Sequence, residues 1–252
     1  MRLAALTASR DRADKLRLVI DCVNNQTLKP DIWVIVDDSK EVLPQNFFDK
    51  LTIPHKYIHQ NQTLPSSTAW NTAIALDSVK ADIYVMFDDD DYYPPTYIEN
   101  AVSFFSSDTD ELIGNRRWPD YRLTDPSYRV RFTGITNNTG THPGDDRGLS
   151  EWRQTLIKGE SLKREIFQLL RQYPTHTCQD CLLREKLFIT DEHYHLYDFG
   201  EEHSSIGLKG YGDGKGVIEA HRSAEGFTPD PDYAMLKKWM GKDIERYKQW
   251  MI

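Results

Sequence analysis

The stretch "DIYVMFDDDDYYPPTYI", residues 82–98, decides how the rest of the chain is interpreted. It opens with a run of apolar residues, which is typical of a strand buried on both faces of a sheet. The run ends in four consecutive aspartates, Asp88–Asp91. Four like charges repel one another, so their position at the end of a buried strand requires a chemical explanation.

The segments around this stretch repeat a strand followed by a helix. Apolar residues predict further strands at 2–7 and 32–36, and periodic apolar positions predict helices over 16–23, 66–79 and 95–105. The alternation continues to about residue 106, which predicts an α/β fold with a mostly parallel central sheet and helices on both faces. Ligands of such sheets bind outside the carboxyl ends of the strands, where Asp38 and Asp88 both fall.

The second half is less regular. We expect one or two strands within 111–134, a loop over 135–150, helices over 159–172 and 178–187, and an amphipathic helix over 231–250 that packs back on the body. There is no internal repeat and no linker, so residues 1–252 are predicted to form a single domain.

Composition narrows the functional classes. The chain has 252 residues and a net charge of −8, and this acidic balance argues against non-specific binding of polyanions by the whole surface. The three cysteines include one C-x-x-C pair, Cys178 and Cys181, without the second pair that a zinc site needs, so we expect reduced thiols. No signal peptide opens the chain and no apolar run reaches membrane-spanning length, which predicts a soluble, cytoplasmic protein.

Three interpretations of the aspartate run follow from its chemistry. It could be a solvated, charge-rich turn. A calcium loop would need a twelve-residue ligand spacing with its glycine, which is absent here. The third interpretation is a site for a divalent cation that also holds the phosphates of a nucleotide, because carboxylate oxygens suit Mg²⁺ and Mn²⁺.

The surrounding motifs select the third interpretation. "LTASRDRADKLRLVIDCVNNQTLKPDIWVIVDDS" (6–39), "TAWNTAIAL" (68–76) and "FDDDDYYPPTYI" (87–98) together resemble the family 2 glycosyltransferases of the GT-A (Rossmann-like) fold. Further along, "CQDCLLREKL" (178–187) is similar to the family's E-D-x-x-L-x-x-R-L segment, with Gln179 in place of the glutamate, and "EEHSSIG" (201–207) resembles its late His-x-x-S-x-S segment. The resemblance covers most of the chain and is weaker over 111–158 and after 207.

This resemblance implies a metal-dependent inverting glycosyltransferase, which moves a sugar from a nucleoside diphosphate, with UDP as the expected donor nucleotide, to a hydroxyl acceptor. Mn²⁺ or Mg²⁺ would be held by Asp90 and His203, with His176 and His221 as rivals of His203, and Asp180 would be the catalytic base. The donor would be bound by residues of the first half: Thr7, Arg10, Asp38, Asn71, Asp88 and Asp89. Residues 1–110 would then be the nucleotide-sugar half, 111–230 the acceptor half and 231–252 a C-terminal helix.

The acceptor is the least defined part of this hypothesis. Arginines alternate with aromatic residues over 115–132, where Trp118, Arg129 and Arg131 are candidate contacts, and Asp145 and Asp146 lie in the following loop. The stretch could be ordinary strands, a stacking platform for a saccharide or small molecule, or a surface for a nucleic acid such as a modified base in DNA. Two other functional classes stay open: a sugar-nucleotide nucleotidyltransferase, against which the glycine-free loop after the first strand counts, and a non-catalytic nucleotide-sugar-binding module.

Overall fold

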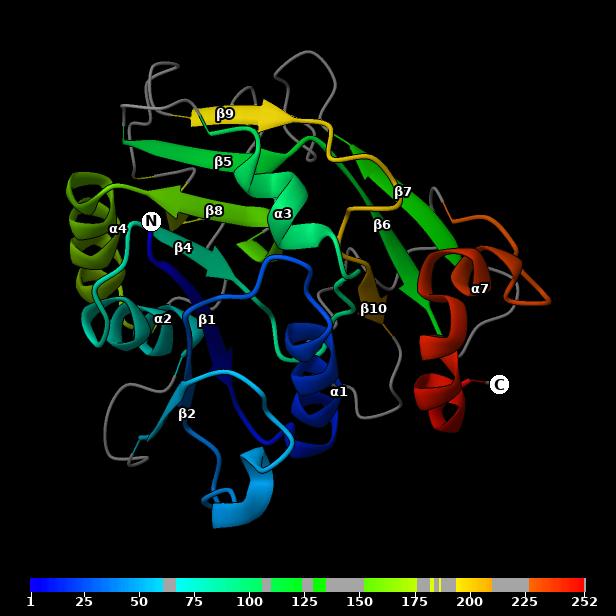
Figure 1. Cartoon of the computed structure of the whole chain (residues 1–252), viewed down its shortest axis with the longest axis horizontal. Coiled ribbons are helices and arrows are strands. Elements are labelled where there is room, and N and C mark those ends of the chain that lie inside the picture. The colour runs from blue at the N-terminus through cyan, green and yellow to red at the C-terminus, as the bar shows by residue number, and fades with distance from the viewer. Residues whose placement is uncertain are drawn as a thin grey trace.

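The computed structural model describes residues 1–60, 67–105, 110–123, 129–134, 152–175, 182–183, 186, 194–209 and 227–251. Within these ranges the chain forms a seven-stranded sheet in the order β3-β2-β1-β4-β8-β5-β9 and a three-stranded sheet in the order β10-β6-β7 (Figure 1). The predicted α/β fold with a mostly parallel central sheet is confirmed.

The first half builds the parallel part of the large sheet. Its elements are β1 (Leu3–Ser9), α1 (Ala13–Asn24), β2 (Ile32–Asp37), a short 3-10 helix η1 (Gln45–Phe48), β3 (His55–His59), α2 (Thr68–Asp77), β4 (Ile83–Met86) and α3 (Tyr97–Val102). Strand β1 pairs in parallel with both β2 and β4, so the carboxyl ends of these three strands meet at one edge of the sheet. The strands and helices expected in this half are all present, with ends that differ by a few residues.

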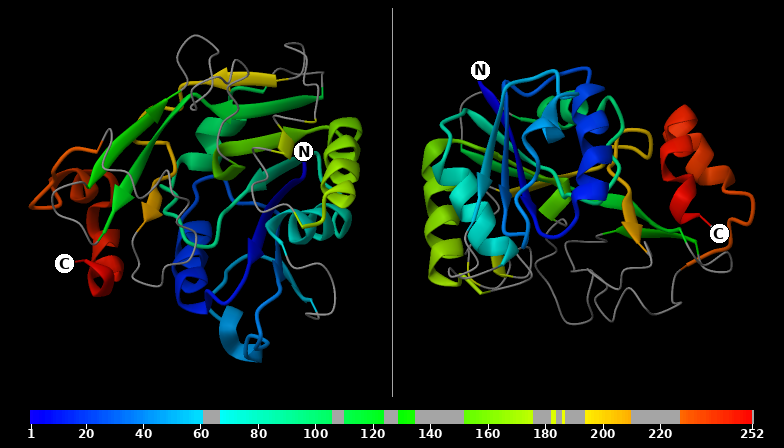
Figure 2. Two further views of the ribbon diagram at one scale, coloured as in Figure 1. Left: turned by 180° about the vertical axis from the view of Figure 1, so that it is seen from behind. Right: turned by 90° about the horizontal axis from the view of Figure 1, so that it is seen from below.

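The helices cover both faces of this sheet, as expected. Alternate residues of β1 point to opposite faces: Leu3 and Ala5 join the core beneath α1, and Ala4 and Leu6 join the core beneath α2 and α4 (Glu160–Gln172). Figure 2 shows α2 and α4 together on one side of the sheet, and α1 on the other.

The second half departs from the parallel pattern. Strand β8 (Thr155–Lys158), which follows the 3-10 helix η2 (Trp152–Gln154), lies between β4 and β5 (Glu111–Asn115) and runs antiparallel to both, and β9 (Tyr194–Tyr197) is parallel to β5. A separate small sheet contains β6 (Arg117–Arg122) between β10 (Gly207–Lys209) and β7 (Val130–Gly134). The stretch 111–134 therefore contributes three strands to two sheets, which the sequence analysis did not foresee.

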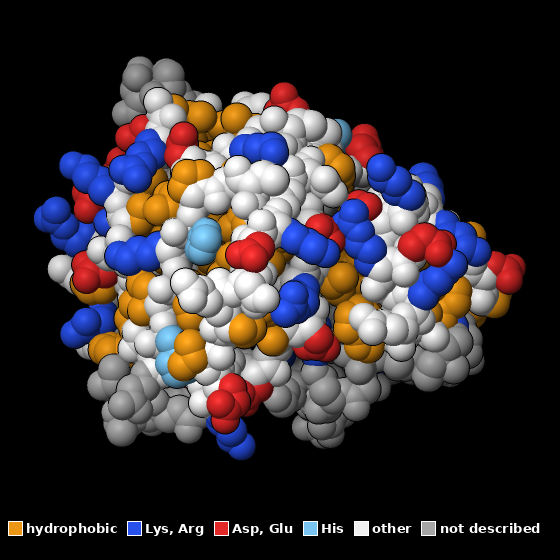
Figure 3. Space-filling view, turned by 60° about the horizontal axis from the view of Figure 1, so that its bottom comes forward, with side chains coloured by type: hydrophobic (Ala, Val, Ile, Leu, Met, Phe, Trp, Pro, Cys, Tyr) orange, Lys and Arg blue, Asp and Glu red, His pale blue; other side chains and the backbone are white. Residues whose placement is uncertain are grey.

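The C-terminal segment packs back on the body as predicted. It consists of α7 (Ala234–Met240) followed by a 3-10 helix, η3 (Gly241–Trp250), in place of one continuous α-helix. Among the described residues, no helix combines the length and the apolar character needed to cross a membrane. On the face shown in Figure 3, basic and acidic side chains are interspersed.

Candidate functional site

The site lies at the edge where β1, β2 and β4 end. The backbone N–H of Asp38 donates to the carbonyl of Ser9 at 3.1 Å, and the N–H of Phe87 donates to the carbonyl of Leu6 at 2.9 Å. These bonds extend the sheet by one residue at each strand end and bring the loops that start at Ser9, Asp38 and Asp88 side by side.

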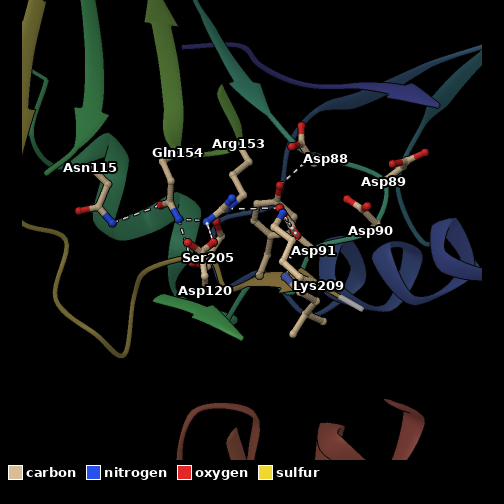
Figure 4. Close-up of polar contacts among 12 residues, drawn as sticks. Asp88, Asp89, Asp90, Asp91, Asn115, Asp120, Arg153, Gln154, Ser205 and Lys209 are labelled. Atoms are coloured by element: carbon tan, nitrogen blue, oxygen red, sulfur yellow. Dashed lines mark hydrogen bonds and ion pairs between the residues drawn. The ribbon is translucent and has the colours of Figure 1, made fainter. Parts of the chain in front are cut away.

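The four aspartates of the run fall into two classes. Asp88 and Asp90 are partly exposed, whereas Asp89 and Asp91 are buried. Carboxylate oxygens of Asp88, Asp90 and Asp91 lie within 4.8 Å of one another, and Figure 4 shows the run extending from the end of β4. Hard oxygen ligands at this spacing fit a divalent cation such as Mg²⁺ or Mn²⁺.

Electrostatics support this fit. Desolvation, followed by repulsion from Asp91 and Asp90, raises the pKa of Asp88 to about 8. Desolvation also raises the pKa of Asp89 to about 6, although Arg12 opposes the shift. Ionising Asp88 and Asp89 is therefore costly in the chain by itself, and a cation beside them would lower that cost.

Asp89 connects the run to the loop after β1. Its carboxylate accepts a hydrogen bond from the Ser9 hydroxyl at 2.8 Å and one from Arg12 Nη1, also at 2.8 Å. The same Arg12 nitrogen lies 2.8 Å from Asp90 Oδ2. Both oxygens of Asp89 thus already have partners within the protein, and Arg12, which the sequence analysis passed over, orients two members of the run.

Two predicted donor residues meet beside the run. Asn71 Nδ2 donates to Asp38 Oδ1 at 3.0 Å, and both side chains are buried. Ser67 caps α2 by accepting from the backbone N–H of Trp70 at 3.0 Å, which fixes the first turn that carries Asn71. Asn71 Oδ1 is buried without a hydrogen-bond partner, so its acceptor capacity is unused, which is uncommon for a buried polar atom.

The other predicted donor and metal residues are placed differently. Thr7 is 2% exposed, and its hydroxyl accepts from Trp33 Nε1 at 2.9 Å in the interior. Arg10 is exposed in the loop that follows β1. His203 Nδ1 lies 2.6 Å from the Thr96 hydroxyl, and His203 is not in the group of ligand atoms formed by the run. The structure therefore does not bring His203 to the proposed cation site.

Of the predicted acceptor residues that the structure describes, Trp118 lies in β6, Arg131 in β7 and Arg129 directly before β7. Trp118 and Arg129 are each 1% exposed, because β6 is the central strand of that sheet and the Arg129 guanidinium packs 3.5 Å over the Tyr233 ring. Arg131 Nη2 is bound to Asp120 Oδ2 at 2.9 Å. These placements disfavour the exposed stacking platform, which was one of the three interpretations of this stretch, and agree with ordinary strands. Five further candidates lie outside the described residues: Asp145, Asp146, His176, Asp180 and His221.

A buried ionic network adjoins the run and escaped the sequence analysis. Arg153 lies between Asp91 and Asp120, and Lys209 lies 3.9 Å from Asp91 (Figure 4). Burial would raise the pKa of Asp120, but Arg153, Lys209 and Arg131 lower it to about 2. Asp91 was visible as the fourth member of the run. No local signal marked Arg153, because its partners are far away in the sequence.

Comparison with known proteins places this site in a family context. The family model described as Glycosyl transferase family 2 matches residues 5–177. No curated protein matches the chain.

Among solved structures, the chain is similar to S. aureus TarS 1-349, with a TM-score of 0.55 and 12% identity over 88% of this chain and 68% of that one. The same TarS fragment in complex with UDP-GlcNAc gives a TM-score of 0.56 and 11% identity over 100% and 74% of the two chains. At such identities the likeness shows a shared fold.

Proposed function

Because this chain belongs to glycosyl transferase family 2, we propose that it transfers a sugar from a nucleoside diphosphate to a hydroxyl acceptor, with inversion at the anomeric carbon and with the help of Mn²⁺ or Mg²⁺. One observation carries the proposal. The carboxylates of Asp88 and Asp90 and the hydrogen-bonded pair Asp38–Asn71 lie at the same edge of the sheet. A cation site and polar groups that can bind a nucleoside are the two parts that a nucleoside diphosphate requires.

We assign the donor to this edge. UDP is the proposed nucleotide, and the similar TarS structure with UDP-GlcNAc supports that choice. Asn71 Oδ1 would accept a hydrogen bond from the nucleoside, and Asp38, which Asn71 orients, would accept another from its base or ribose. Asp88 and Asp90 would hold the cation, which when bound supplies positive charge that neutralises the departing diphosphate.

The acceptor hydroxyl needs a base on the opposite face of the sugar. In the proposed step the hydroxyl oxygen forms a bond to the anomeric carbon, the bond from that carbon to the diphosphate oxygen breaks, and the proton passes to the base. Asp180 remains our proposal for this base from its place in the family motif. The acceptor itself is proposed to be a saccharide or another hydroxyl-bearing small molecule held by residues 111–230.

The products distinguish the proposed activity from its alternatives. With a panel of UDP-sugars, Mn²⁺ and candidate acceptors, we expect release of UDP, and we expect excess chelator to abolish it. Pyrophosphate formed from UTP and a sugar 1-phosphate would indicate a nucleotidyltransferase instead. Binding of UDP-sugars without turnover would indicate a non-catalytic binding module.

Asp90→Asn tests the cation site directly. We expect transfer to fall by at least about 100-fold, since a bound metal contributes several kcal/mol to charge stabilisation in the transition state. The fold should persist, because the change removes one of several repelling charges. Asp49→Asn, at an exposed position after η1, is the matched control and should keep parent activity. Parent activity in Asp90→Asn would refute the assignment.

A further inference from the structure

The last aspartate of the run differs from its neighbours in its surroundings. The Asp91 side chain is 0% exposed, and its Oδ1 accepts a hydrogen bond from the backbone N–H of Leu208 at 2.9 Å. Its Oδ2 lies 3.2 Å from Arg153 Nε, and Lys209 Nζ lies 3.9 Å from Oδ1. The charge of Asp91 is therefore compensated by two cations of the protein itself.

Arg153 connects the run to two other parts of the fold. Its Nη2 donates to Asp120 Oδ1 in β6 at 3.2 Å, and its backbone carbonyl accepts from the Tyr97 hydroxyl in α3 at 2.8 Å. The side chain is 3% exposed. Its Nε contacts Asp91 Oδ2 as an ion pair without a hydrogen bond, and the planar guanidinium, held by Asp120, fixes the position of that positive charge beside Asp91.

The backbone next to this pair leaves no space for a side chain. A Cβ atom at Gly207 would lie 2.4 Å from Asp120 Oδ1 and 2.6 Å from Arg153 Nη2. Gly207 begins β10, whose next residue donates to Asp91. The glycine thus allows β10 to approach the Arg153–Asp120 pair and the run at the same time.

We infer that Asp91 is the structural anchor of the aspartate loop rather than a cation ligand, and that Arg153 is the positioning residue that holds it. The oxygens of Asp91 do come within 4.8 Å of those of Asp88 and Asp90. However, turning Asp91 toward a cation would leave the buried Arg153 without one of its two carboxylates, which is costly. The inference rests on the proposed function, because it concerns the loop that carries the proposed cation ligands Asp88 and Asp90.

The test measures Mn²⁺ affinity in the presence of UDP, together with thermal unfolding, for the parent, Asp91→Asn, Arg153→Met and the double variant. If Asp91 is an anchor, both single variants loosen the same loop, so each should weaken Mn²⁺ binding by a similar factor, about 10- to 100-fold as for other residues that orient metal ligands. The double variant should be no weaker than the worse single variant. Arg17→Met removes an arginine at an exposed position of α1, where it packs on Phe47, and should keep parent Mn²⁺ affinity.

A cation ligand at position 91 predicts a different pattern. Asp91→Asn would then weaken Mn²⁺ binding, whereas Arg153→Met would remove a competing positive charge and leave the affinity unchanged or tighter. Weaker Mn²⁺ binding in Asp91→Asn together with unchanged or tighter binding in Arg153→Met would overturn the inference. The inference would also be overturned if both variants melted at lower temperatures but bound Mn²⁺ with parent affinity. Arg153 would then stabilise the fold without positioning the cation ligands.

Two further variants keep the test decisive if either substitution prevents folding. Arg153→Lys keeps the charge without the fork, and Gly207→Ala changes no charge but pushes on the Arg153–Asp120 contact. Both are expected to bind Mn²⁺ more weakly than the parent, and parent affinity in both would overturn the inference. If the parent itself fails to bind Mn²⁺ with UDP, the metal dependence in the proposed function is refuted. The anchor is then judged by melting temperatures, where non-additive losses for the Asp91 and Arg153 variants support it and additive losses refute it.

Discussion

At the scale of single residues, the neighbours of each aspartate decide its chemistry. Asp88 and Asp90 face partly outward, Asp89 is held by Ser9 and Arg12, and Asp91 is compensated by Arg153 and Lys209. Identical side chains at consecutive positions therefore differ in charge compensation and in access. Asp88 combines a raised pKa with partial exposure, whereas the partly exposed Asp90 is paired with Arg12 at 2.8 Å.

The raised pKa of Asp88 predicts that stability falls as pH rises from about 4 to about 8 when no divalent cation is present. The folded chain keeps a proton on Asp88 up to about pH 8, whereas the unfolded chain releases it near the ordinary aspartate pKa of 3.8. In that window the folded state binds more protons, so the free energy of unfolding decreases with rising pH. Asp120 acts outside this window, since its pKa is lowered to about 2.

Melting temperatures in chelator across this pH range test the prediction. Asp88→Asn cannot ionise, so its curve should be flatter than that of the parent. Added Mn²⁺ should raise the melting temperature of the parent more near pH 8 than near pH 5, because the cation binds the ionised carboxylates. If the melting temperature of the parent stays constant or rises with pH over this window, the raised pKa of Asp88 is contradicted.

At the scale of elements, Gln26 ties the end of α1 to the segment that follows the run. Its amide donates to the carbonyls of Cys22 and Pro94 at 3.2 and 2.8 Å, and its Oε1 accepts from the backbone N–H of Ile98 at 3.0 Å. The side chain is buried. One amide thus satisfies backbone groups of two helices and of the loop between the run and α3.

Gln26→Leu should lower the free energy of unfolding by about 1–3 kcal/mol, the usual cost of leaving buried polar groups unsatisfied. The neighbouring Thr27→Ala is the control. Thr27 makes its side-chain hydrogen bonds to Pro95 and Glu99 at the surface, so its removal should change stability by no more than about 0.5 kcal/mol. Urea unfolding of both variants measures the difference, and equal stabilities would show that Gln26 does not fix this segment.

At the scale of the whole molecule, the C-terminal segment closes the core over α1 and the small sheet. Arg246 pairs with Asp21 of α1 at 3.2 Å, and Asp243 accepts a hydrogen bond from the Tyr92 hydroxyl at 3.3 Å. Tyr247 is 2% exposed and meets the Tyr92 ring edge-on at 6.2 Å. The last residues of the chain therefore support the segment directly after the aspartate run.

Tyr247→Ala should destabilise the whole molecule by about 3–5 kcal/mol, as do other truncations of large buried aromatic side chains. Lys248→Ala is the matched control. Lys248 is exposed and pairs with Glu245 on the same helix, an interaction worth little in solvent. Denaturant unfolding should show the loss in one cooperative transition. A change confined to a separate minor transition would mean that the segment folds independently of the body.

The sequence by itself determined the parallel half of the fold and the edge that carries the site. Apolar runs and helical periodicity are local properties, and parallel order brings the carboxyl ends of successive strands together, so Asp38 and Asp88 could be placed at one edge without coordinates. The spacing of the motifs also pointed to the correct family. None of these inferences required knowledge of contacts between distant segments.

The tertiary structure alone decided which polar residues meet and which are buried. Arg153 pairs with Asp91 and Asp120, His203 with Thr96, and Arg129 with Tyr233 across long stretches of sequence. The reversal of β8 between two other strands creates the first of these pairings by bringing Arg153 under the aspartate run. The charge state and exposure of a side chain depend on partners that packing supplies, so a run of four aspartates could be found in the sequence while their separate roles could not.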